Sequence, residues 1–89
     1  MEFRYRKEFE KNMKKLQPKI KEKAKERLIV FSTNPFHPLL RNHALHGIYD
    51  GLRSIDVTGN IRIIFRQVNT QTYEIIELLD IGTHSELYE

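Results

Sequence analysis

Three strand-like runs joined by two short turns constrain the fold of this chain more than any other feature of its sequence. The runs cover residues 52–57, 61–65 and 73–81, and the turns between them hold Thr58-Gly59-Asn60 and residues 69–72. Connections this short leave no room for a crossover, so consecutive strands must pair antiparallel. The C-terminal half of the chain is therefore predicted to form an antiparallel meander.

The middle and last runs carry apolar side chains in alternation, and successive strand residues point to opposite faces of a sheet. In the middle run this puts Ile61, Ile63 and Phe65 on one face and Arg62, Ile64 and Arg66 on the other. In the last run it puts Ile75, Leu79 and Ile81 on one face and Ile76, Leu78 and Asp80 on the other. One face of the sheet is thus expected to carry charged side chains.

Two amphipathic stripes precede the strands. Apolar residues recur every three or four positions, first at Phe9, Met13 and Leu16 and then at Ile20, Ala24, Leu28 and Phe31. Pro18 ends the first helix and opens a second one that runs to about residue 32. Because the connection is so short, the two helices should form an antiparallel hairpin. A short strand is expected at residues 3–5.

The resulting architecture is α+β, with an N-terminal helical hairpin packed on a small antiparallel β-sheet. A chain of 89 residues holds one core, so residues 1–89 are expected to form a single domain. The helices should shield one face of the sheet and leave the other open. Between helices and strands, residues 33–51 lack any period and predict a long loop, a kind of segment that is often functional.

Composition excludes several classes of protein. The chain has no cysteine, which removes disulfide frameworks, cysteine-ligated zinc and thiol nucleophiles. Its longest apolar run is residues 28–31, too short for a membrane span or a signal peptide, so we expect a cytosolic protein. The four glycines form neither a dinucleotide-binding nor a P-loop motif, and no cofactor is expected.

Charge is distributed unevenly along the chain. Residues 1–27 carry eleven Lys or Arg against five Glu, whereas residues 71–89 carry five acids and no Lys or Arg. Six lysines and one arginine stand close together, at Lys14, Lys15, Lys19, Lys21, Lys23, Lys25 and Arg27. They form either a solvated helix face, partly neutralised by Glu22 and Glu26, or a ridge that contacts nucleic-acid phosphates without reading bases.

A second cationic group lies on the predicted sheet. Arg62 and Arg66 share one strand face, and Arg53 on the preceding run joins them or points away, depending on register. Guanidinium groups on an open face suit forked binding of phosphate. The alternative is a set of ion pairs across the strands with Asp56, Asp80, Glu74 or Glu77.

Three of the four histidines, His37, His43 and His46, lie in the long loop, and the fourth is His84. The HxxH spacing at 43–46 is a weak metal signal because no third ligand lies nearby in the sequence, and we expect no metal site. An imidazole with a pKa near about 6.5 can take and give a proton near neutrality. One or two of these histidines are therefore candidates for general acid–base catalysis, although each taken alone is better explained as an ordinary surface or hydrogen-bonded residue.

Three stretches of the sequence resemble the RelE/ParE superfamily of bacterial toxin–antitoxin toxins, nearest to its YafQ-like RelE branch. Residues 34–47, with the ending His43-Ala-Leu-His-Gly47, resemble the segment before the sheet in that branch. Residues 52–66 resemble the central hairpin of the toxins, and residues 81–88 the terminal signature G-x-H-x-x-L-[YF]. With the helical hairpin, the resemblance covers nearly the whole chain.

This resemblance implies a type II toxin that enters the ribosomal A site and cuts mRNA there as an endoribonuclease. In that reaction a ribose 2′-OH attacks the adjacent phosphate and leaves a cyclic phosphate. By position, His84 matches the terminal catalytic histidine, His43 the loop histidine, Arg62 the arginine on the scissile phosphate, and Tyr88 the aromatic residue near the cleaved base. The implied partners are a cognate antitoxin, the ribosome and mRNA, with operator DNA contacted only through the antitoxin.

The chain departs from the pattern of the branch at three positions. Asp56 stands where a further histidine is common, Asn60 replaces an acid, and Asp80 replaces an arginine found in some relatives. Asp56 and Asn60 are therefore secondary catalytic candidates. The resemblance favours phosphate contact for the six lysines and for Arg53 and Arg66. Two alternatives stay open: a ParE-like inhibitor of DNA gyrase without nuclease activity, and a decayed toxin that only binds its antitoxin.

Overall fold

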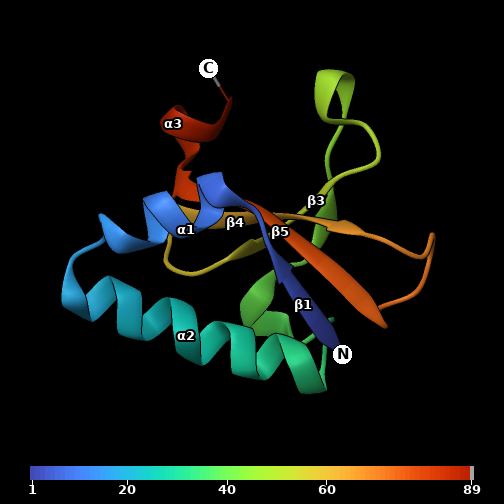
Figure 1. The fold of residues 1–89 in the computed structure, drawn as a ribbon, viewed down its shortest axis with the longest axis horizontal. Coiled ribbons are helices and arrows are strands. Elements are labelled where there is room, and N and C mark those ends of the chain that lie inside the picture. Colours follow the sequence, from blue (N-terminus) through green and yellow to red (C-terminus); the bar gives the residue numbers. More distant parts are fainter. Residues whose placement is uncertain (89) are drawn as a thin grey trace.

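One five-stranded sheet organises the protein, with two helices on one side and a short helix on the other (Figure 1). The computed structural model describes residues 1–88. The strands are β1 (Glu2–Tyr5), β2 (His43–Ala44), β3 (Arg53–Asp56), β4 (Ile61–Gln67) and β5 (Ile75–Thr83). The helices are α1 (Lys7–Lys14), α2 (Pro18–Thr33) and α3 (His84–Tyr88), and two 3₁₀ turns are η1 (Pro38–Leu40) and η2 (Gly47–Tyr49).

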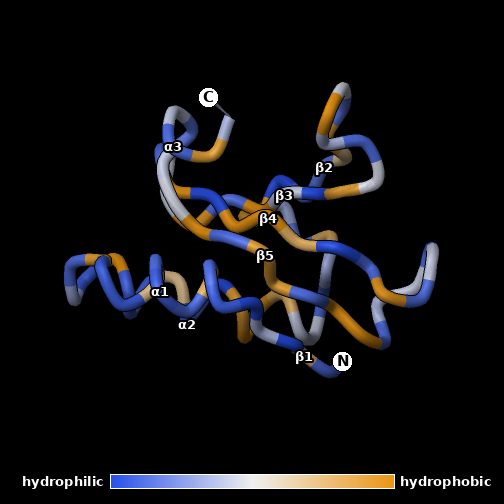
Figure 2. The backbone as a smooth tube through the Cα atoms, turned by 45° about the horizontal axis from the view of Figure 1, so that its top comes forward, coloured by the Kyte–Doolittle hydropathy of each residue, from blue (hydrophilic) through white to orange (hydrophobic). Residues whose placement is uncertain are grey.

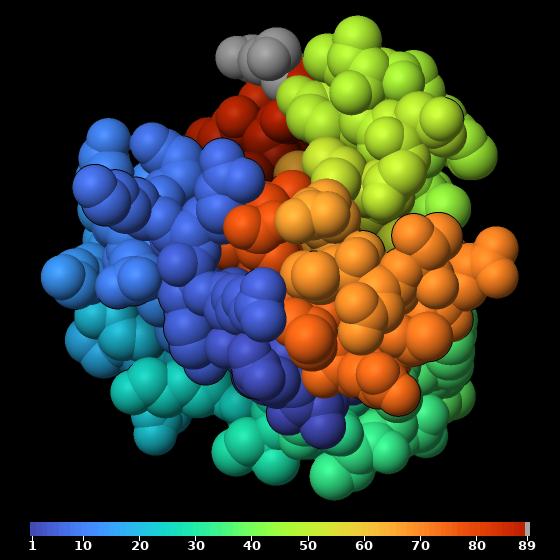
Figure 3. Space-filling model, turned by 45° about the vertical axis from the view of Figure 1, so that its right-hand side comes forward, coloured from blue at the N-terminus to red at the C-terminus, as the bar shows by residue number. Residues whose placement is uncertain are grey.

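The strand order is β1-β5-β4-β3-β2. The predicted meander is confirmed, because β3 pairs antiparallel with β4 and β4 antiparallel with β5. The edge strand β1 pairs parallel with β5, which makes the sheet mixed. Figure 3 shows the N-terminal segment lying against β5 on the molecular surface. The α+β class with a helical hairpin on a small sheet is confirmed.

The helices α1 and α2 form where the apolar stripes predicted them. Pro18 occupies the first turn of α2, where its missing N–H costs nothing. The helices pack Phe9, Ala24 and Phe31 against one face of the sheet, and Phe31 stacks near Phe65 with ring centroids 4.9 Å apart. This face holds the main core. No helix within residues 1–88 has the length and apolar character needed to cross a membrane.

The opposite face of the sheet carries a smaller apolar cluster of Leu45, Ile64 and Leu87. In Figure 2, α1 and α2 lie on one side of the strands, while α3 and the loop that contains η2 rise on the other. The expected open face of the sheet is therefore only partly covered, by two short elements with a space between them.

The prediction that side chains alternate strictly between the two sheet faces along β5 was wrong. Ile64 pairs with Asp80 but its neighbour Phe65 pairs with Leu78, so Leu79 is an extra residue in a β-bulge. As a result Ile81 lies in the main core together with Ile76 and Leu78, and not on the face of Leu79. The bulge reverses the alternation just before α3, and so helps to decide on which side of the sheet α3 begins.

The segment 33–51 is more ordered than a loop without periodicity suggests. It contains both 3₁₀ turns and the two-residue strand β2, which pairs with β3 so that His43 lies opposite Ser54. Arg41 takes a left-handed backbone conformation with φ of 47° at the end of η1, directly before β2. This pairing fixes the otherwise irregular segment to the edge of the sheet.

Candidate active site

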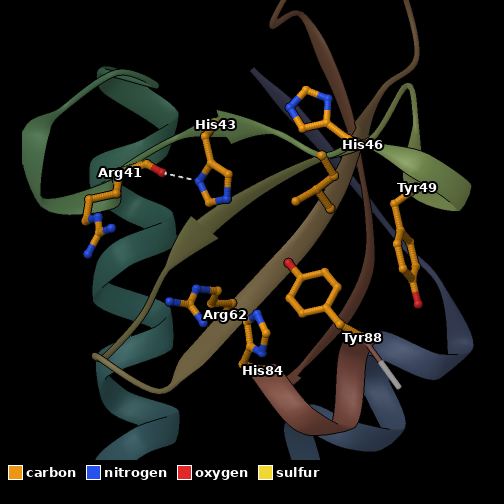
Figure 4. Close-up of a pocket in the computed structure, with 8 residues that line it drawn as sticks. Arg41, His43, His46, Tyr49, Arg62, His84 and Tyr88 are labelled. Atoms are coloured by element: carbon orange, nitrogen blue, oxygen red, sulfur yellow. Dashed lines mark hydrogen bonds between the residues drawn. The ribbon is translucent and has the colours of Figure 1, made fainter.

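A hollow of about 280 Å³ lies on the partly covered face of the sheet, between the η2 loop and α3 (Figure 4). Its walls come from three separate parts of the chain, the segment 41–49, β4 and α3. They are Arg41, His43, Leu45, His46, Tyr49, Arg62, His84 and Tyr88. The hollow thus combines three imidazoles, two guanidinium groups and two phenol rings.

His43 is held by a backbone carbonyl. Its Nδ1 lies 2.8 Å from the carbonyl oxygen of Arg41. Because a carbonyl oxygen only accepts hydrogen bonds, this Nδ1 carries the proton, and in the neutral ring Nε2 keeps its lone pair. Figure 4 shows the His43 ring turned into the hollow. The arrangement suits His43 to accept a proton from a molecule bound there.

Arg62 is held from behind by a carboxylate. Its Nε donates a hydrogen bond to Asp56 Oδ1 at 3.2 Å, and Arg41 Nε lies 3.6 Å from Asp56 Oδ2. Asp56 is 7% exposed, so its charge is shared between two guanidinium groups at the wall of the hollow. This leaves the terminal nitrogens of Arg62 without protein partners among residues 1–88 and available to an anion.

The helix α3 is fixed by a reciprocal capping box at its first residues. Glu86 N–H donates to Thr83 Oγ1 at 3.1 Å, and Thr83 N–H donates to Glu86 Oε1 at 2.8 Å. Hydrogen bonds to the Glu86 carboxyl, first from the Thr83 backbone N–H and then from the Thr83 side chain, lower its pKa below the ordinary value of 4.5. The cap sets the start of a turn on which His84 and Tyr88 are neighbours, with ring centroids 4.6 Å apart.

Tyr49 connects the two walls of the hollow. Its hydroxyl donates a hydrogen bond of 2.8 Å to the carbonyl oxygen of Leu87, and its ring meets Tyr88 edge to face at 5.5 Å. Figure 3 shows the η2 loop meeting α3 at the surface. The contact holds the loop that carries His46 against the helix that carries His84.

The structure brings together the four main predicted catalytic residues, His43, Arg62, His84 and Tyr88. Asp56 adjoins them through Arg62, although its contacts are those of a residue that orients arginines. Asn60 does not line the hollow. It lies in the turn between β3 and β4, where its N–H donates to Thr58 Oγ1.

Two predicted arginines lie apart from the hollow. Arg53 pairs with Phe65 and so points to the helix-covered face, where it donates to Asn42 and stacks over Phe36. The strand register therefore places Arg53 on the face opposite to Arg62, so the two do not form one cluster. Arg66 points to the same face as Arg62, but it forms a cross-strand ion pair with Glu77 at 2.9 Å.

The six predicted lysines do not form one ridge. Lys14 and Lys15 lie at the end of α1, and the other four belong to α2. At 100° per residue, Lys19 and Lys23 fall on one flank of α2 and Lys21 and Lys25 on the other, on either side of the buried Ala24. Neither flank borders the hollow at α3.

Four lining residues lie outside the main predicted catalytic set: Arg41, Leu45, His46 and Tyr49. His46 was one of the four histidines considered for acid–base catalysis, whereas Arg41, Leu45 and Tyr49 had no predicted role. The available signal was their position in the long loop beside His43. Among residues 1–88 no group of three His, Asp or Glu side chains is placed to hold a metal ion.

A helical hairpin on a mixed sheet, with arginine, histidine and aromatic side chains on the exposed face, defines a RelE-like toxin fold. A family model described as "Bacterial toxin of type II toxin-antitoxin system, YafQ" matches residues 1–89. The chain belongs to this family and is a type II toxin of the YafQ type. No curated protein sequence matches the chain at a significant level.

Solved structures agree on the fold. The YafQ toxin of E. coli strain BL21(DE3) superposes with a TM-score of 0.81 at 22% identity, over 99% of this chain and 98% of that one. YafQ in the E. coli DinJ-YafQ toxin-antitoxin complex gives 0.75 at 24% identity, over 99% and 97%. A YoeB/ParE toxin from Agrobacterium tumefaciens gives 0.76 at 17% identity, over 94% and 99%.

Proposed function

We propose that this toxin is an endoribonuclease that cleaves mRNA on the ribosome and so inhibits translation. The observation that carries the proposal is the convergence of His43, His84 and Arg62 on one hollow. Attack of a 2′-OH on the adjacent phosphate needs a base, an acid and positive charge, and these three side chains supply all of them.

The geometry of each residue suggests its role. His43 takes the proton of the 2′-OH through Nε2, because its Nδ1 is engaged with the Arg41 carbonyl. His84 gives a proton to the leaving 5′-oxygen. Arg62, oriented by Asp56, stabilises the charge on the phosphorane. The Tyr88 ring, next to His84, offers an aromatic face on which the base at the cleavage site stacks.

The partners in this proposal are the ribosome, mRNA and a cognate antitoxin. The E. coli toxin YafQ is found in complex with DinJ, and a Mycobacterium tuberculosis relative in the complex RelBE2. The basic N-terminal third of this chain and the arginines of the hollow suit an acidic antitoxin segment that covers the site. Within this scheme the toxin contacts operator DNA only through the antitoxin, and it acts in the cytosol.

The test is cleavage of mRNA on programmed ribosomes. Wild-type toxin is expected to cut the message and leave a 2′,3′-cyclic phosphate, and a 2′-deoxy nucleotide at the cleavage position should abolish the cut. His84→Gln should slow cleavage by about 10²–10⁴-fold, the usual share of one proton-transfer group. His37→Gln is the matched control, because His37 lies outside the hollow, where Nδ1 accepts the N–H of Leu39.

Two results would contradict the proposal. Cleavage that survives a 2′-deoxy substitution would exclude attack by the 2′-OH. An intact message together with arrested DNA supercoiling by gyrase would instead favour the ParE-like alternative.

A further inference from the structure

A second hollow adjoins the candidate active site on the other side of Asp56. It lies between α2 and the β3–β4 turn and is lined by Lys23, Arg27, Leu39, Asp56, Val57, Thr58 and Gly59. Its volume, about 380 Å³, exceeds that of the hollow around His84. Of its lining residues, only Asp56 has a role in the catalysis proposed above.

Two cations, Lys23 and Arg27, line this second hollow from α2. Lys23 and Arg27 are four residues apart on α2 and therefore side by side on one flank. The Arg27 side chain is only 12% exposed, and its Nε is buried without an acceptor among residues 1–88. Within residues 1–88 its only ion pair is a long contact of 3.4 Å from Nη1 to the exposed Glu26. The hollow therefore has two neighbouring positive charges on one wall, an arrangement that suits an anion such as phosphate.

The acid in this hollow does not neutralise those cations. Asp56 is already engaged by Arg62 and Arg41, both of which line the active-site hollow. One ion-paired layer thus separates the two hollows, with Arg62 and Arg41 on one side and Lys23 and Arg27 on the other.

We propose that Lys23 and Arg27 form a subsite for a second phosphodiester of the same mRNA strand whose scissile phosphate lies at Arg62. The subsite positions the strand without reading its bases, because phosphate contacts carry no direct sequence information. It also divides the lysines of α2 by function, since Lys21 and Lys25 lie on the other flank. This inference rests on the proposed ribonuclease function and assigns part of its substrate contact.

The experiment measures binding of a single-stranded RNA that carries a 2′-deoxy nucleotide at the cleavage position, so that affinity is read without cleavage. The full-length double variant Lys23→Gln/Arg27→Gln should bind about tenfold more weakly than wild type. The slope of log affinity against log salt, taken from about 50 to 200 mM, should fall by about 0.7, which corresponds to one neutralised single-strand phosphate.

The matched control is Lys7→Gln/Lys11→Gln. These two exposed lysines have the same spacing on α1 and the same charge change, so they report the effect of net charge alone. Circular dichroism and thermal unfolding establish that both double variants fold. The control should keep wild-type affinity within about twofold, with its salt slope unchanged.

Three outcomes would overturn the inference. Equal losses in both double variants would show a general charge effect. A loss confined to ribosome binding, with free RNA bound normally, would assign the phosphate to rRNA. A loss confined to antitoxin binding would make the hollow a site for an acidic peptide. If wild-type toxin cleaves RNA and the Lys23/Arg27 variant binds it normally, only the subsite fails, whereas a wild type that neither binds nor cuts RNA removes the proposed function too.

Discussion

The two faces of strand β4 differ in what their side chains do. On one face Ile63 and Phe65 are fully buried beneath α1 and α2. On the other, Arg62 reaches a hollow and Arg66 pairs at the surface with Glu77. The closed face stabilises the sheet through apolar contacts, whereas the partly covered face presents charged side chains. Stability and proposed chemistry are therefore separated by one residue along the same strand.

Truncating a side chain on the closed face should lower the stability of the protein more than truncating one on the partly covered face. Phe65→Ala removes a fully buried ring that packs on Phe31 at 4.9 Å, and we expect the free energy of unfolding to fall by about 3–5 kcal/mol. Urea denaturation followed by circular dichroism measures the change. Arg66→Ala, one residue along and on the other face, should cost no more than about 1 kcal/mol because its ion pair is exposed. Equal losses would contradict the contrast between the faces.

On the partly covered face, a substitution should reduce the cleavage rate strongly without destabilising the fold as much as Phe65→Ala. Asp56→Asn keeps the volume but removes the charge that orients Arg62, and we expect cleavage to slow by up to about 10²-fold. The shape of the pH–rate profile should stay as in wild type, because Asp56 positions an arginine and transfers no proton. Partial rescue by Asp56→Glu would support this role. A profile that loses one limb in the Asn variant would instead make Asp56 an acid–base group.

The smallest effect concerns the cap that fixes α3. Because the pKa of Glu86 is lowered in the folded protein, its ionised form stabilises the fold above pH 4.5, and this contribution is lost as the pH falls through the lowered value. Glu86→Gln keeps a hydrogen-bond acceptor but removes the charge. The midpoint temperature of thermal unfolding should be higher for wild type than for the variant at neutral pH. This difference in midpoint should disappear in acid. A difference in midpoint that persists in acid would show that the charge of Glu86 does not cause it.

Much of this fold was readable from the sequence. The apolar stripe from Ile20 to Phe31 and the proline at position 18 predicted α2, and the two short turns predicted the meander. The bulge at Leu79 was not predictable from alternation, since an extra residue in one strand is set by how its neighbours pair and pack. For the same reason the side of Arg53 depended on a register that the sequence left open.

The candidate site shows the same division. The sequence by itself determined the residue types, placing imidazoles at 43 and 84 and a guanidinium at 62, because motif spacing is a property of the chain. Only the tertiary structure decided that these groups share one hollow, that Arg41 and Tyr49 complete it, and that the lysines of α2 divide between two flanks. Such contacts join residues far apart in the sequence, and only the packing of β2, β4 and α3 around a common core fixes them.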